Sequence, residues 1–230
     1  NEFDGKTTIY VPPKWFGHYL VYHNVGIKDN TLYVWGQTEN ELREWTRFVR
    51  RYQISYGNDN QGRDIPMELN YFENPLTNIE QTCDVIHDEI SFLITPVRIN
   101  NNFHLHNDVL IPTFVDIIES GSLFNDIKAF VYTGDIKQKK RAVLLYWILD
   151  ALFDGKVFNY EETFEETTVV NQGNKRISKT KLHCFKTMIW GQNRVPPWYN
   201  HENRFGMFNS FQSQVYYYQY YTFTKLGIPF

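Results

Sequence analysis

The sequence lacks several features that would place the chain in a specialised class. Only two cysteines, Cys83 and Cys184, occur in 230 residues, too few for a disulfide framework or a four-thiolate metal site. They form either one disulfide or two buried free thiols. No apolar run approaches the roughly eighteen residues that a membrane helix needs. No Asn-x-Ser/Thr sequon occurs either, which weakens the case for a glycosylated secretory protein.

The chain also carries little excess charge of either sign. It has 23 Lys and Arg against 26 Asp and Glu, a net charge of −3, whereas a general nucleic-acid binder normally carries a basic excess. The longest basic cluster spans only residues 137–141. Glycine-rich phosphate loops and the Gly-x-Ser-x-Gly elbow of hydrolases are missing as well. We therefore expect no nucleic-acid partner.

Apolar and aromatic residues, by contrast, are plentiful. They make up 42% and 17% of the chain, with 18 Phe, 16 Tyr and 6 Trp. This composition excludes a disordered chain, because aromatic side chains bury more area than other types. A chain of this length can bury roughly 70% of its unfolded surface and suits one large domain or two small ones.

The first part of the chain has the pattern of a hairpin followed by a helix. Residues 19–22 and 31–35 have strand composition, and residues 28–30 between them have turn composition, which predicts a β-hairpin. Asn40 is placed to cap a helix over residues 41–51.

Strands and helices alternate in the remainder of the chain. Strands are predicted at residues 90–94, 129–132, 157–158, 167–170 and 182–189, and helices at residues 109–118, 139–153 and 205–226. The tyrosines at 216–218 also suit a strand, and the acidic run 150–166 is predicted to be mostly a solvated connection. The alternation predicts parallel βαβ units and an α/β fold with a Rossmann-like open sheet.

Two regions are expected on this basis. Residues 1–78 comprise the N-terminal hairpin, the helix and a connecting loop, with residues 56–78 polar and rich in turn formers. Residues 79–230 comprise the Rossmann-like α/β domain. The chain begins with Asn1 and has no signal-peptide pattern, and we expect both of its ends to be cut ends of a longer product.

The densest polar cluster, residues 100–108, lies between a predicted strand and a predicted helix. Ligands of open α/β sheets bind at such junctions, beyond the carboxyl ends of the strands. If the helix extends back, His104 and Asp108 share a face at i and i+4, and a carboxylate that orients a histidine is a usual acid–base arrangement. The alternative is that Asn107 or Asp108 caps the helix, with His104 as a partner in that cap.

Two other kinds of chemistry fit the sequence less completely. His104, His106 and Asp108 resemble the first half of a metallo-β-lactamase site, but the further histidine expected after the aspartate is absent, and a metal site needs its other ligands. His183 and Cys184 suggest a base and a nucleophile. Neighbours on a strand, however, point to opposite faces, so Cys184 is predicted to be a buried structural residue.

Aromatic residues in a loop-like stretch suggest a carbohydrate platform. Trp190, Arg194, Trp198 and Tyr199 lie in or beside residues 191–203, and exposed rings with polar neighbours can stack on sugars. Arg194 and Trp198 are therefore candidate substrate-binding residues. The alternative is that these rings cover the edge of the core.

Three stretches of the sequence resemble glycosyltransferase family 61, which includes protein O-linked N-acetylglucosaminyltransferases and xylosyltransferase-like enzymes. Residues 92–94, followed by Asn-x-Phe-His-x-x-x-Asp at 101–108, are similar to the family's strand and motif. Residues 183–191 resemble its Cys-Phe-Lys segment, and residues 208–228 resemble the helix before its domain junction. The chain departs from the family where Pro112 stands four residues after Asp108 rather than three, and it contains no His-Gly-Ala motif of the donor-binding domain.

The resemblance implies an inverting, metal-independent and cofactor-free transfer from a nucleotide sugar, expected to be a UDP-sugar, to a glycan or glycoprotein acceptor. It implies one half of a two-domain GT-B-type enzyme, here the N-terminal, acceptor-side half without the donor domain, in the lumen of the endoplasmic reticulum or Golgi. Membrane contact is expected only through an anchor outside this chain. Asp108 or His104 would be the catalytic base, and Asn101 would hold the loop. The alternative is a non-catalytic glycan-binding or scaffold protein derived from such an enzyme.

Overall fold

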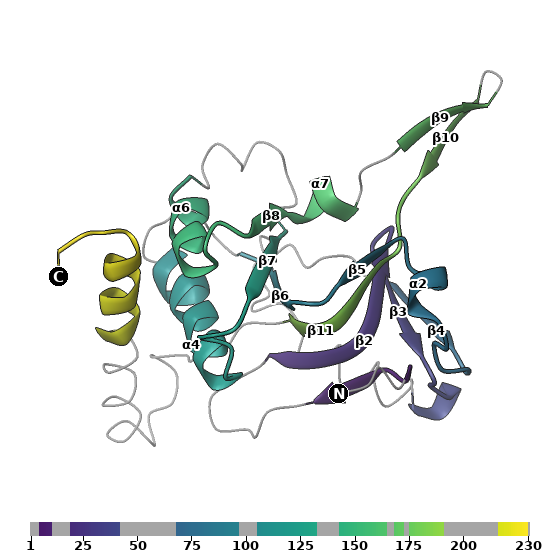
Figure 1. The fold of residues 1–230 in the computed structure, drawn as a ribbon, viewed down its shortest axis with the longest axis horizontal. Coiled ribbons are helices and arrows are strands. Elements are labelled where there is room, and N and C mark those ends of the chain that lie inside the picture. The colour runs from purple at the N-terminus through teal and green to yellow at the C-terminus, as the bar shows by residue number, and fades with distance from the viewer. Residues whose placement is uncertain are drawn as a thin grey trace, which may run out of the picture.

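The computed structural model shows an α/β protein built on one large mixed sheet (Figure 1). It describes residues 5–10, 19–41, 68–96, 105–132, 143–164, 168–172, 175–190 and 216–229. The strands of the large sheet are β1 (Thr8–Tyr10), β2 (Leu20–Lys28), β3 (Thr31–Trp35), β4 (Glu68–Phe72), β5 (Val85–His87), β6 (Ile90–Ile94), β7 (Ile127–Val131), β8 (Val157–Asn159) and β11 (His183–Trp190). The predicted α/β class is therefore confirmed.

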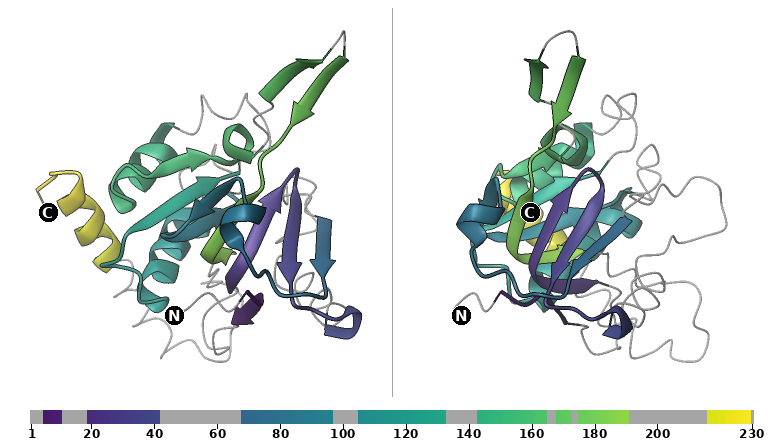
Figure 2. Two further views of the ribbon diagram at one scale, coloured as in Figure 1. Left: turned by 45° about the vertical axis from the view of Figure 1, so that its right-hand side comes forward. Right: turned by 90° about the vertical axis from the view of Figure 1, so that its right-hand side faces the viewer.

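The sheet combines antiparallel pairing around β2 with a parallel half, and its edge strand β4 runs parallel to β3. Its order is β4-β3-β2-β11-β6-β7-β8, with β1 beside β2 and β5 beside β11. Strands β1, β3 and β11 each run antiparallel to β2, whereas β11, β6, β7 and β8 run parallel to one another. A separate hairpin of β9 (Thr168–Gln172) and β10 (Lys175–Lys179) projects away from the sheet (Figure 2).

Helices cover the parallel half of the sheet on both faces. The turn η1 (Leu105–Leu110) and the helices α4 (Ile111–Glu119) and α6 (Val143–Leu152) pack on one face, together with a C-terminal helix at residues 216–225. The short helix α7 (Tyr160–Phe164) packs on the other face. Strand β6 shows the expected two-residue alternation, because Phe92 and Ile94 join the first core and Leu93 joins the second.

A bulge interrupts the centre of the sheet. Strand β11 advances three residues from Phe185 to Met188 while its partner advances four, from His87 to Ser91, so β5 and β6 contain one extra residue. Strand β2 is irregular beside this bulge. Asn24 has a positive φ of 57°, and the side chains of β2 that are buried change register there, from Leu20 and Tyr22 to Val25 and Ile27. Asparagine tolerates this left-handed conformation better than most residues.

Several local predictions are confirmed. The N-terminal hairpin is formed by β2 and β3, and its turn residues Asp29 and Asn30 have φ angles of 50° and 56°. Positive φ at both central residues is the signature of the type I′ turn that suits a twisted hairpin. Strand β6 has the predicted bounds, and the C-terminal helix contains the tyrosines that also suited a strand.

Three local predictions need correction. The helix after β3 begins at Glu39 rather than after an Asn40 cap, because Thr38 and Glu41 form reciprocal capping hydrogen bonds. The connecting region 56–78 contains strand β4, which pairs with β3. The run 150–166 contains β8 and α7, and its Tyr160 and Phe164 are buried, so this segment is not mainly a solvated connection.

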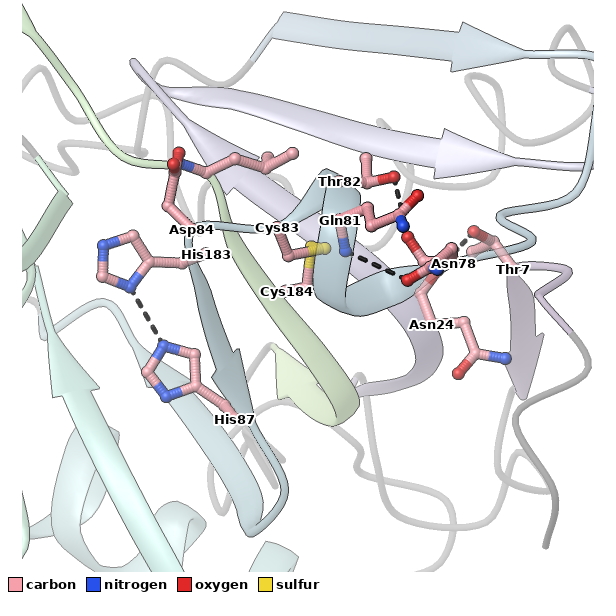
Figure 3. The surroundings of a disulfide bond; sticks show 11 residues. Thr7, Asn24, Asn78, Gln81, Thr82, Cys83, Asp84, His87, His183 and Cys184 are labelled. Carbon is pink, nitrogen blue, oxygen red and sulfur yellow. Dashed lines mark hydrogen bonds between the residues drawn. A yellow bond between two sulfur atoms is a disulfide. The ribbon is translucent and has the colours of Figure 1, made fainter.

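The two cysteines form a disulfide that links the end of α2 to β11. Cys83 follows the short helix α2 (Ile79–Thr82), and Cys184 lies at the start of β11 (Figure 3). Both sulfur atoms belong to a small core with Trp35, Leu76 and Leu182. The bond closes a loop across a sequence separation of 101, and it resolves the choice between a disulfide and two free thiols.

No helix in the described part of the chain combines the length and apolar character that crossing a bilayer requires.

Removing the disulfide should destabilise the fold substantially. In the double variant Cys83→Ala/Cys184→Ala we expect the free energy of unfolding to fall by about 3–5 kcal/mol, because a loop of this length gains that much entropy when the crosslink is lost. Urea denaturation of the double variant, compared with the oxidised and reduced wild type, measures the change. A loss below about 1 kcal/mol in the double variant would contradict the expectation.

Candidate functional site

The polar cluster singled out in the sequence precedes the first helix of the parallel half. Strand β6 ends at Ile94, and the helical segment begins at Leu105 with η1, a wider turn of π type that runs without interruption into α4. Its Leu105, Val109 and Leu110 are buried in the first core. Because π-type turns are energetically poorer than α-helix and concentrate at functional sites, this junction is the first candidate site.

A hydrogen bond ties η1 to the C-terminal helix. The Nδ1 atom of half-buried His106 lies 3.1 Å from the phenol oxygen of Tyr218. The two rings meet edge to face with centroids 6.1 Å apart, and Tyr218 also packs edge-on against Phe114 of α4 at 5.8 Å. Tyr218 thus contacts the His106 ring through both its hydroxyl and its own ring, and Phe114 packs against Tyr218 in turn.

Burial sets the protonation of this pair. It lowers the pKa of His106 below its ordinary value and raises the pKa of Tyr218 far above its own, because each charged form loses hydration on burial. At neutral pH the pair is therefore a neutral imidazole and a neutral phenol. Such an imidazole can accept a proton or donate a hydrogen bond through the nitrogen that Tyr218 does not occupy.

A buried carboxylate lies in the helix that follows. Asp116 of α4 is 1% exposed and sits in the middle of the first core. The pKa of Tyr19 is raised strongly, first by burial and then by the charges of Asp116 and Glu119. Tyr19 therefore stays a protonated phenol near the carboxylates of Asp116 and Glu119.

Most of the candidate site residues lie beyond what the structure describes. His104, Asn101, Arg194 and Trp198 are outside the described residues, and for Asp108 only the backbone is described, within η1. The proposed pairing of His104 with Asp108 therefore remains a prediction. The sequence alone does not reveal Tyr218 or Asp116 as site residues, because an aromatic run and an apolar helix carry no local sign of a polar partner.

The described side chains contain no group of three or more His, Cys, Asp or Glu that could hold a metal ion. Of the three residues in the metallo-β-lactamase alternative, only the His106 side chain is among those described, and its Nδ1 faces Tyr218. The metal alternative therefore gains no support from this part of the chain.

The pair His183–Cys184 is divided between the two faces of β11, as the sequence predicted. The Cys184 sulfur is bonded to Cys83 on one side of the strand, and the His183 ring lies on the other (Figure 3). A sulfur atom held in a disulfide is no nucleophile until it is reduced. The prediction that Cys184 is a buried structural residue is confirmed.

His183 instead forms a buried pair with His87. The Nε2 atom of His87 lies 3.0 Å from Nδ1 of His183, and the His87 ring stacks on Phe185 with centroids 4.5 Å apart. Burial lowers the pKa of His87 to about 3, with a smaller contribution from Lys128. Burial likewise lowers the pKa of His183 to about 4, with a smaller contribution from Lys181. Both rings are therefore neutral at physiological pH, and one donates its hydrogen to the other.

No protein-family model matches the sequence, and no curated protein matches it either.

Removing the Tyr218 hydroxyl should weaken the link between η1 and the C-terminal helix. We expect Tyr218→Phe to lower the free energy of unfolding by about 1 kcal/mol, because a buried hydrogen bond is lost while the ring packing is kept. Tyr217→Phe is the matched control, since Tyr217 is the exposed neighbour on the same helix. Equal effects of the two substitutions in thermal and urea denaturation would argue against the His106–Tyr218 bond.

The histidine pair should make the protein sensitive to mild acid. Both folded-state pKa values lie below the ordinary value of 6.5, so between pH 6.5 and about 4 the unfolded chain binds more protons. The contribution to stability is complete above pH 6.5 and is lost as the pH falls through about 4 for His183 and about 3 for His87. Each imidazole adds a slope of up to about 1.4 kcal/mol per pH unit.

The double variant His87→Phe/His183→Phe tests the origin of this slope. It removes both titrating rings and keeps aromatic side chains in an aromatic core. We expect its unfolding free energy, measured in urea from pH 7 to pH 4, to fall less steeply than that of the wild type. Parallel curves for the two proteins would show that other groups cause the acid sensitivity.

Proposed function

We propose that the chain is the N-terminal, acceptor-side half of an inverting, nucleotide-sugar-dependent glycosyltransferase of the two-domain GT-B type. One observation carries the proposal. The segment that resembles the family motif follows β6 and enters a π-type turn at the start of α4, the part of an α/β sheet where ligands bind. The parallel strands β6, β7 and β8, linked through α4 and α6, support a Rossmann-like arrangement.

The proposed chemistry requires one proton transfer and one displacement. An acceptor hydroxyl gives its proton to a base, its oxygen attacks the anomeric carbon of the sugar, and the bond from that carbon to the diphosphate breaks. UDP leaves on the opposite face, which inverts the configuration. In this proposal Asp108 or His104 is the base, Asn101 holds the loop, and Arg194 and Trp198 contact the acceptor.

The His106–Tyr218 pair fits this scheme as a positioning element. His106 lies on η1 between the two candidate bases in sequence, and its ring is held by a buried phenol. Holding the turn in place would fix the direction in which the base approaches the acceptor, because a displacement of about 1 Å can cost a hundredfold in rate.

The Cys83–Cys184 disulfide supports the proposed location in the lumen of the endoplasmic reticulum or Golgi. Disulfides persist in oxidising compartments and are rare where thiols are kept reduced. The bond is buried, since Cys184 is 1% exposed and Cys83 is 8% exposed.

Transfer assays on the longest natural product that contains this chain test the proposal. Incubation with UDP-sugars and glycan or glycoprotein acceptors should yield an inverted glycoside, with Asp108→Asn or His104→Ala lowering kcat by at least about a hundredfold, as loss of a general base does. Asp126→Asn is the matched control, because Asp126 directly precedes β7 and so lies at the amino end of the parallel strands.

Three outcomes are informative. Full activity in both Asp108→Asn and His104→Ala would overturn the assigned roles. Sugar binding without transfer from any donor would overturn the enzyme and assign the alternative, a non-catalytic glycan-binding protein. Loss of activity in the Asp126→Asn control as well would show a general structural effect and reject the specific role of the motif.

A further inference from the structure

A pocket of about 350 Å³ opens beside β8 and α7, on the face of the sheet opposite to η1. Its lining comes from β8, from α7, which follows β8 directly in the chain, and from Lys181 and His183 at the start of β11. The residues that matter for recognition are Phe158, Asn159, Glu162, Thr163, Lys181 and His183. None of them belongs to the site proposed for transfer.

His183 contributes a buried polar atom to this pocket. Its side chain is largely buried, and its Nδ1 is occupied by the hydrogen bond with His87 (Figure 3). Nε2 is therefore the ring nitrogen available to a molecule in the pocket. The His183 ring is held in place by its edge contact with Phe164, and its partner His87 is held by stacking on Phe185.

Phe158 adds an apolar surface beside these polar groups. Its side chain is 44% exposed, although it is aromatic and lies in a strand. The ring stacks on buried Phe130, with centroids 5.6 Å apart and planes 29° apart. This stacking fixes the orientation of the Phe158 ring. An aromatic face fixed in this way can pack against the C–H groups of a ring-shaped ligand.

Internal hydrogen bonds hold the wall of the pocket. The Asn159 side chain accepts from the Glu162 backbone N–H at 2.9 Å and donates to the Tyr146 hydroxyl at 3.3 Å. The Thr163 hydroxyl donates to the Asn159 carbonyl at 2.7 Å. These bonds connect β8 to α7 and α6, so the wall is formed before a ligand arrives, which lowers the entropic cost of binding.

The charges around the pocket disfavour an anion. Lys181 is positive, Glu162 is negative, and His183 is neutral at physiological pH because burial lowers its pKa to about 4. Phosphate or carboxylate ligands normally meet an excess of positive donors, which is absent among these groups. A neutral ligand with several hydroxyl groups suits them better, since a hydroxyl can donate to Glu162 and either donate to or accept from His183.

We propose that this pocket binds a neutral sugar ring. The ring lies against Phe158, its hydroxyls bond to His183 Nε2, Lys181 and Glu162, and the wall formed by Asn159 and Thr163 limits its size. This is a second sugar site, separate from the transfer site, and it does not depend on the proposed enzyme activity. In the proposed enzyme, this site would hold a part of the glycan other than the reacting hydroxyl.

Binding of methyl glycosides of neutral hexoses and pentoses to the 230-residue chain tests the proposal. We expect saturable chemical-shift changes in NMR spectra at the side chains of Phe158 and His183. Phe158→Ala should weaken binding by about tenfold through loss of the aromatic surface. Tyr71→Ala is the matched control, because Tyr71 is a partly exposed aromatic residue on β4, at the opposite end of the strand order.

The outcomes separate this proposal from its competitors. Unchanged sugar binding in Phe158→Ala, or equal weakening in Tyr71→Ala, would place the sugar elsewhere and overturn it. Binding of inorganic phosphate in place of glycosides would also overturn it. Lys181 is exposed, so Lys181→Ala leaves the histidine pair intact and should weaken sugar binding without altering the thermal midpoint of unfolding. This variant tests the pocket even if variants of His183 fail to fold. Absence of any sugar transfer together with sugar binding in this pocket would reject the proposed enzyme and support the pocket proposal.

Discussion

The pairing of β11 between β2 and β6 is the interaction on which the rest of the structure depends. This late strand runs antiparallel to β2 and parallel to β5 and β6, so it joins the N-terminal hairpin to the parallel half. Residues far apart in sequence meet there, as in the contact between the His23 ring and the Thr187 hydroxyl at 3.1 Å. The Cys83–Cys184 bond adds a covalent link at the start of the same strand.

The alternation of side chains along β11 divides its chemistry between two faces. Cys184 faces a small core and stabilises the fold through its disulfide, while His183 faces α7 and the pocket. The bulge between β5 and β6 comes directly after His87, and bulges concentrate near functional groups because they redirect side chains. One strand thus carries both a stabilising crosslink on one face and the histidine of the proposed pocket on the other.

The two proposed sites lie on opposite faces of the sheet. The π-type turn η1 belongs to the face covered by α4 and α6, whereas the sugar pocket belongs to the face covered by α7. A chain that transfers a sugar to a glycan gains from holding the acceptor at more than one point, because two weak contacts on one molecule act cooperatively. The neutral states of His106 and His183 have the same physical cause, since burial lowers the pKa of each imidazole.

The sequence by itself determined the local elements, including the Asp29–Asn30 turn and the strand over Ile90–Ile94, because composition and turn chemistry act over a few residues. It also determined that His183 and Cys184 point apart, since strand alternation is local. Only the tertiary structure decided that Cys184 meets Cys83, that His183 meets His87, and that Tyr218 meets His106. Each of these contacts joins segments about a hundred residues apart, where pairing depends on the order of strands and the burial of whole faces and leaves no mark in local sequence.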